Sequence, residues 1–96
     1  SVFLIFDNKI YTPPLRSGVV NSVSRKVLIS FISKNSYYKI IEEEIPVFNL
    51  QRAEEIFLFS FQHGLTKVIK FRKKEFSFIK SKTIEDLFFE DLRNQF

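Results

Sequence analysis

The first fourteen residues constrain the fold most strongly. Residues 2–6 form an apolar run of strand length, residues 7–9 interrupt it with Asp and Asn, and residues 10–12 resume it. Asp and Asn tolerate turn geometry, so this pattern predicts a β-hairpin. Two prolines at 13–14 end its second strand, because proline has no N–H to donate to a sheet. The chain is therefore expected to build a β-sheet from this end.

Helical and strand patterns alternate after the hairpin. A helix is predicted at residues 23–35, a strand at 37–45 and a short helix or turn at 47–53. Two strands follow at 55–59 and 66–71, separated by a loop, and a final helix starts at Ser81 or Thr83. In the first helix, apolar residues recur at helical spacing at Val23, Val27, Leu28, Phe31 and Ile32. The expected buried stripe of the last helix is Ile84, Leu87, Phe88 and Leu92. This order predicts an α/β fold, a mixed sheet with packed helices, in a single domain over residues 1–96.

Composition excludes several function classes. The 96 residues are 45% hydrophobic and 27% charged, which is typical of a globular domain. No Cys is present, so we expect neither a disulfide nor a thiolate metal site. No apolar segment reaches membrane-spanning length and no signal-peptide pattern occurs, which predicts a cytoplasmic protein with no membrane partner. The net charge of +4 accompanies thirteen Phe and many Ile and Lys, as in AT-rich codon usage, so no nucleic-acid partner is expected.

The start of the first predicted helix is a candidate anion site. A helix N-terminus has backbone N–H groups without intrahelical partners, and its dipole favours an anion. Ser22 and Ser24 add hydroxyl groups there, and Arg25 adds positive charge. The alternative is that Ser22 only caps the helix, which is the commoner role of a serine in this position.

The other polar clusters of the sequence are weaker candidates for a binding or catalytic site. His63 lies in the loop at 60–64 with no second metal ligand at suitable spacing, so it is read as a surface residue. The acidic run at 42–44 would alternate between the two faces of a strand, which favours a solvated edge over a metal site. The basic run at 72–74 is read as a solvated turn. No catalytic constellation and no metal site are predicted.

The order of these segments resembles a known family. Residues 2–5 form an apolar strand, residues 7–15 read DNKIYTPPL, residues 17–20 read SGVV, and residues 22–25 read SVSR. Class IV aminotransferases and their lyase relatives show a similar strand, a D-G-x-I-Y-T-P-P hairpin, S-G-I-L, and G-I-T-R at a helix start. Residues 53–58, AEEIFL, are similar to their A-D-E-V-F-L. The resemblance covers nearly the whole chain and implies the C-terminal domain of the D-amino-acid aminotransferase-like fold.

The resemblance also implies a cofactor, pyridoxal 5′-phosphate. In the family, backbone amides at the G-I-T-R helix start bind the cofactor phosphate, which assigns cofactor binding to Val23 and Ser24. The loop after the A-D-E-V-F-L strand implies further cofactor contacts at Ser60 and Phe61 and a substrate contact at Gln62. Many family members carry a small hydroxyl residue where this chain has Phe61. That difference would remove one phosphate donor, worth about 1–3 kcal/mol.

The family's catalytic residues have no counterpart in this chain. The lysine that forms the Schiff base and the glutamate that pairs with the pyridinium nitrogen are both expected upstream of Ser1, so no catalytic residue is assigned within these 96 residues. The chain also lacks Met. We therefore expect a C-terminal fragment of a longer two-domain enzyme that is inactive alone and dimeric when complete. Loss of the N-terminal domain should expose an apolar, Phe-containing patch beside Ser24 and Ser60.

The resemblance extends to more than one activity. Transaminases of branched-chain or D-amino acids carry a D-G-R-P-I-G-like hairpin before the last helix, where this chain reads FRKKEF at 71–76. The shorter form is more similar to 4-amino-4-deoxychorismate lyase, which releases pyruvate to give 4-aminobenzoate for folate synthesis. A transaminase acting on a small amino substrate is the alternative, and a non-catalytic or decayed α/β binding domain is the alternative from another class.

Overall fold

A computed structural model describes residues 1–14, 23–35 and 38–95, without the side chains of residues 47 and 48. The elements are β1 (Val2–Phe6), β2 (Lys9–Thr12), α1 (Val23–Asn35), β3 (Lys39–Glu42), α2 (Val47–Leu50), β4 (Glu55–Ser60), β5 (Gly64–Lys67), β6 (Lys70–Phe71), β7 (Lys74–Glu75) and α3 (Lys80–Gln95). Five strands form one sheet in the order β3-β2-β1-β4-β5, and β6 and β7 form a separate hairpin. The β2–β3 pair is parallel and the other pairs are antiparallel, so the predicted mixed α/β sheet is confirmed.

The predicted N-terminal hairpin is present. Its turn residues Asp7 and Asn8 have φ angles of 52° and 59°, the left-handed region that a two-residue hairpin turn requires. Leu4 then pairs with Tyr11 across the hairpin. Asp and Asn adopt left-handed φ angles with a smaller free-energy penalty than most residues, so their presence at positions 7 and 8 predicted the turn correctly.

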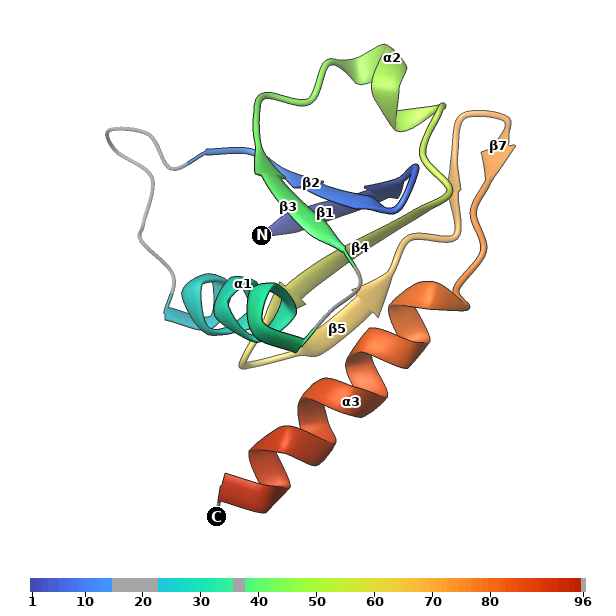
Figure 1. Ribbon diagram of the computed structural model, residues 1–96. Helices are drawn as coiled ribbons and strands as arrows, with labels where there is room; N and C mark the ends of the chain where they lie inside the picture. Colours follow the sequence, from blue (N-terminus) through green and yellow to red (C-terminus); the bar gives the residue numbers. More distant parts are fainter. Residues whose placement is uncertain (15–22, 36–37, 96) are drawn as a thin grey trace.

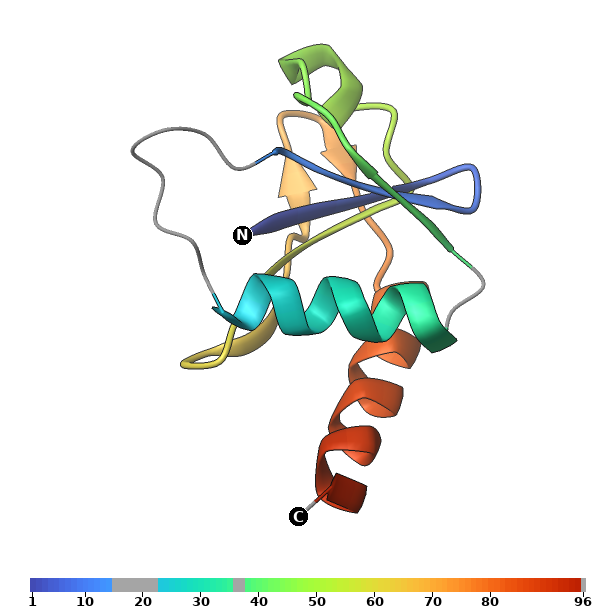
Figure 2. The same cartoon turned by 60° about the vertical axis from the view of Figure 1, so that its left-hand side comes forward.

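The sheet separates two apolar layers (Figure 1). Helices α1 and α3 cover one face, where the core includes Phe3, Ile5, Leu28, Phe57 and Phe88. Helix α2 and the β6–β7 hairpin lie on the other face, which Figure 2 shows in a second view. A smaller cluster packs there around three buried side chains, Leu4, Ala53 and Ile56. Alternating side chains of β1 and β4 supply both layers.

Several predicted boundaries and faces need correction. The strand predicted at 66–71 divides, because Val68 still donates to the Ile56 carbonyl at 3.0 Å but the chain then leaves the sheet at Ile69, which is 65% exposed. The strand predicted at 37–45 is confined to β3. Leu87 was expected to be buried, but it is exposed.

The last helix starts earlier than predicted because of a buried carboxylate. Glu55 of β4 accepts hydrogen bonds from the backbone N–H groups of Ile79, Lys80 and Ser81, at 3.2, 2.9 and 2.8 Å. An anion at this position satisfies N–H groups that a helix leaves without partners and interacts favourably with the helix dipole. Helix α3 therefore begins at Lys80, one to three residues before the expected start.

Candidate functional site

The first candidate segment is the start of α1. The helix begins at Val23, as predicted, while Ser22, its expected cap, lies outside the described residues. The side chain of Val23 is 68% exposed, whereas Ser24 is buried. The first turn of α1 contains no acidic residue. An anion near this turn would therefore meet the positive end of the helix dipole without a carboxylate in that turn to repel it.

Arg25 has a structural function at this end of the sheet. Its side chain is 6% exposed, and its guanidinium donates to the Pro13 carbonyl at 2.8 Å and lies 3.5 Å from the Glu42 carboxylate. These partners follow β2 and end β3, so Arg25 ties the first turn of α1 to two strand ends. The sequence pattern had assigned this charge directly to the anion site.

The second candidate segment is the turn between β4 and β5. Ser60 ends β4, and its Oγ accepts a hydrogen bond from the His63 N–H at 3.1 Å. Phe61 is 53% exposed, and its ring meets that of Phe59 edge-on with centroids 6.0 Å apart. Gln62 is also exposed. The positive φ of Gly64, 69°, returns the chain into β5.

The fold brings these two segments to one side of the molecule. In both Figure 1 and Figure 2, the turn from β4 to β5 lies beside the start of α1. They are separated by about forty residues of sequence, yet both end at the same margin of the sheet. Together they place a helix N-terminus, the buried Ser24, the half-buried Ser60 and the exposed residues of the turn at one margin. This combination can bind an anion such as a phosphate.

The expected apolar patch is only partly present. Val23 and Phe61 are exposed at this margin. The other large exposed apolar side chains of the described residues lie in β4, in α3 and in the segments that flank the β6–β7 hairpin: Leu58, Leu87, Ile69 and Ile79. Among the Phe side chains that the structure describes, Phe61 alone is exposed. Within the described residues, the expected Phe-containing patch is thus reduced to one ring, because most of the other described Phe side chains pack in the two core clusters.

The remaining predicted clusters contribute no site. Within the described residues, no group of three or more His, Asp or Glu side chains could hold a metal ion. No described helix is long and apolar enough to cross a membrane. Sequence reasoning missed the role of Glu55, although the signal was present: it is a single carboxylate at the start of the apolar strand EIFLFS.

Comparison with known proteins gives a consistent family. The model of amino-transferase class IV matches residues 1–71. The D-alanine aminotransferase of Staphylococcus haemolyticus is 34% identical over 70 residues, which are 73% of this chain and 24% of that protein. This chain thus spans about a quarter of that relative's length.

Solved structures show the same fold. A branched-chain amino acid aminotransferase from Thermobaculum terrenum, crystallised in its PLP form, superposes with a TM-score of 0.87 at 19% identity, covering 99% of this chain and 32% of that one. The 4-amino-4-deoxychorismate lyase from Pseudomonas aeruginosa gives a TM-score of 0.83 at 22% identity, covering 95% of this chain and 34% of that one. At these identities the two structures establish the fold alone.

Proposed function

Since the chain belongs to the amino-transferase class IV family, we propose that it supplies the phosphate-binding part of a pyridoxal 5′-phosphate enzyme. The observation that carries the proposal is the placement of the α1 start beside the β4–β5 turn. The chain covers about a third of its structural relatives, so the activity belongs to a larger protein. We place that protein in the cytoplasm, with an N-terminal domain that completes the site and a homodimeric assembly.

Each site residue has a proposed task. The backbone N–H groups of Val23 and Ser24 hold the cofactor phosphate, and the Ser24 hydroxyl adds a donor. Ser60 and Phe61 line the same phosphate from the turn, and Gln62 faces the amino substrate. The bound cofactor supplies an electron sink for the substrate carbanion. Arg25 holds the helix start in place, because its guanidinium is committed to Pro13 and Glu42.

The catalytic lysine and the glutamate for the pyridinium nitrogen are proposed to come from sequence that precedes Ser1 in the complete protein. Lys9, Lys26 and Lys34 do not match the family position of that lysine. We therefore expect the 96 residues alone to be inactive.

For the reaction itself, we favour the lyase that releases pyruvate and forms 4-aminobenzoate for folate synthesis. The supporting observation is the short hairpin before α3, whose strands β6 and β7 have two residues each and whose turn contains no glycine. A D-amino-acid or branched-chain transaminase is the second candidate, favoured by the 34% identity to a D-alanine aminotransferase.

The test uses the full-length protein loaded with pyridoxal 5′-phosphate. Pyruvate release from aminodeoxychorismate without an added 2-oxo acid supports the lyase, whereas amino transfer that requires a 2-oxo acid supports a transaminase. Saturable cofactor binding without either reaction would point to a decayed enzyme. Ser24→Ala should weaken cofactor binding, and Ser30→Ala, an exposed serine of the same helix, should not. Equal binding by the two variants would contradict the role assigned to the Ser24 hydroxyl.

A further inference from the structure

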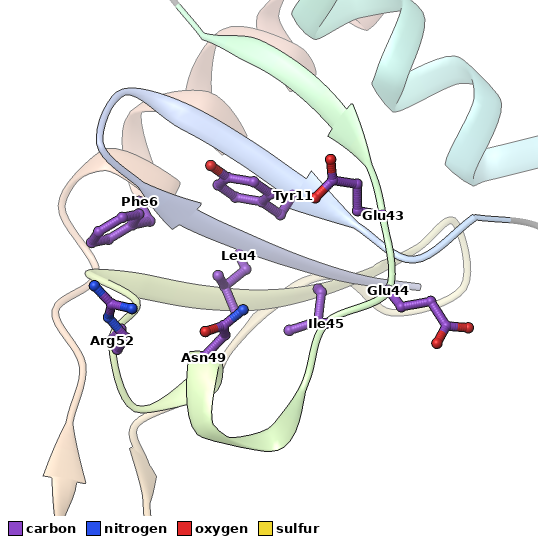
Figure 3. A pocket seen from close by; sticks show the side chains of 8 residues that line it. All are labelled: Leu4, Phe6, Tyr11, Glu43, Glu44, Ile45, Asn49 and Arg52. Carbon is purple, nitrogen blue, oxygen red and sulfur yellow. The ribbon is translucent and has the colours of Figure 1, made fainter.

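A second concave site lies on the face of the sheet that carries α2. The cavity has a volume of about 250 Å³ and is lined by Leu4, Phe6, Tyr11, Glu43, Glu44, Ile45, Asn49 and Arg52. These side chains come from β1, β2 and the segment around α2, as Figure 3 shows. Helix α1 covers the opposite face of the sheet (Figures 1 and 2), so the cavity is separate from the proposed phosphate site.

Four polar side chains of this cavity lack polar partners within the described part of the chain. They are the Tyr11 hydroxyl, the Glu43 carboxylate, the Asn49 amide and the Arg52 guanidinium. The guanidinium carbon of Arg52 lies over the face of the Phe6 ring, 5.9 Å from its centroid. Most ligand sites combine an apolar surface with a few convergent polar groups of this kind.

The charges of the cavity are arranged along its length. Arg52 stacks on Phe6, at the end of β1 where the hairpin turns. Glu43 follows Glu42, which pairs with Thr12 at the far end of β2. Figure 3 shows Arg52 and Glu43 at opposite ends, with Leu4 and Tyr11 between them. A ligand that satisfied both ends would carry opposite charges separated by an apolar body.

We propose that this cavity binds an elongated amphoteric small molecule, with its carboxylate on Arg52 and its amino group on Glu43. Leu4, Tyr11 and Ile45 would contact the apolar body, while Asn49 would supply a hydrogen bond from the α2 side. The volume corresponds to about eight water molecules at roughly 30 Å³ each, so the ligand is a small metabolite rather than a peptide. This second site lies on the opposite face of the sheet from α1 and so is separate from the proposed cofactor site.

The test is equilibrium dialysis of the full-length protein with 4-(aminomethyl)benzoate, a rigid probe with an ammonium and a carboxylate at opposite ends. Benzoate and benzylamine are the comparison probes, because each lacks one charge. We expect the amphoteric probe to bind most tightly, and Arg52→Gln or Glu43→Gln to weaken it about tenfold or more, as the loss of a charged hydrogen bond predicts. Both side chains are exposed, so these variants should fold normally.

Matched substitutions on α3 provide the controls. Arg93→Gln and Glu90→Gln remove the same charges from exposed positions away from the cavity and should leave probe binding unchanged. The proposal is overturned if the amphoteric probe does not bind, if it binds no better than benzoate and benzylamine, or if Arg52→Gln and Glu43→Gln have no effect. Because neither residue belongs to the proposed phosphate site, these outcomes leave the proposed function standing.

Discussion

The Glu55 carboxylate and Ser81 form a doubly hydrogen-bonded pair inside the protein. Oε1 of Glu55 accepts from the Ser81 backbone N–H at 2.8 Å and from the Ser81 Oγ at 2.7 Å. Both residues are almost completely buried. Through this pair, β4 determines where α3 begins and how it meets the sheet. The same strand carries Ser60 at its other end, so one element connects the C-terminal helix with the proposed phosphate site.

Replacing this carboxylate should destabilise the protein. Glu55→Gln keeps the size of the side chain but turns an NH₂ group toward donors and removes the charge at the start of α3. Hydrogen bonds to charged groups contribute about 1.5–3 kcal/mol each, so we expect a net loss of about 3 kcal/mol in the free energy of unfolding. Glu54→Gln is the matched control: Glu54 is a surface partner of Lys80, and its loss should cost about 1 kcal/mol or less. Chemical denaturation measures both, and similar losses for the two variants would contradict the argument.

The same carboxylate predicts a pH dependence. Burial alone would raise the pKa of Glu55, but the hydrogen bonds from Ser81, Lys80 and Ile79 together hold that pKa below its ordinary value of 4.5. A pKa that is lower in the folded protein adds stability above the unfolded pKa, and this stability is lost as the pH falls through the folded pKa. The difference in unfolding free energy between wild type and Glu55→Gln should thus be constant near neutral pH and shrink below about pH 4.5. A difference that grew with acidification would reverse the assigned sign.

Local signals in the sequence were sufficient for most elements. The Asp7–Asn8 turn and the apolar runs of β1 and β4 depend on neighbouring residues only, so the sequence predicted them directly. The predicted buried face of α3 was less reliable. Helical spacing identifies residues that share a face, but it does not show how much of that face the sheet and α1 cover. Ile84 and Phe88 face the core, whereas Leu87, one position away, lies at the margin of the contact.

The site depended on contacts between distant residues, which a single sequence does not display. The helix start at Ser24 was a candidate from its own sequence, the role of Ser60 came from the family resemblance, and the fold then placed the two segments on one side. The partners of Arg25 and Glu55 are 12 and more than 20 residues away, so neither role followed from local pattern. The positive charge of Arg25 suggested that it contacts a ligand. In the structure its side chain is buried and contacts Pro13 and Glu42 at the ends of two strands.

The corrected face of α3 can be measured directly. Ile84→Ala removes a side chain that is 5% exposed and should cost about 2–4 kcal/mol through lost burial and a residual cavity. Leu87→Ala alters a side chain that is 47% exposed and should cost about 1 kcal/mol or less. Thermal or chemical unfolding of the two variants gives the comparison. Equal losses would mean that another part of the protein covers Leu87.

Loss of Arg25 should affect both stability and cofactor binding. Arg25→Ala leaves the Pro13 carbonyl and the Glu42 carboxylate without this donor, and we expect a loss of about 1–3 kcal/mol in unfolding free energy. Lys26→Ala, at the exposed neighbouring position, should stay within about 0.5 kcal/mol of wild type. Cofactor titration should show weaker binding for Arg25→Ala at temperatures where the variant is fully folded. Unchanged cofactor affinity would limit Arg25 to a purely stabilising role.

Phe61 offers a prediction in which binding improves. It is 53% exposed and, by the family resemblance, takes the place of a small hydroxyl residue, so Phe61→Ser should add a phosphate donor at little structural cost. A gain of about 1.4 kcal/mol, within the range for a hydrogen bond to an anion, corresponds to about tenfold tighter binding of pyridoxal 5′-phosphate. Phe61→Leu is the control, because it shortens the apolar side chain without adding a hydroxyl. Fluorescence titration of the full-length variants with the cofactor gives the two dissociation constants. If Phe61→Ser binds no more tightly than Phe61→Leu, the turn does not contact the phosphate through this position, and the assignment of the β4–β5 turn would then depend on Ser60.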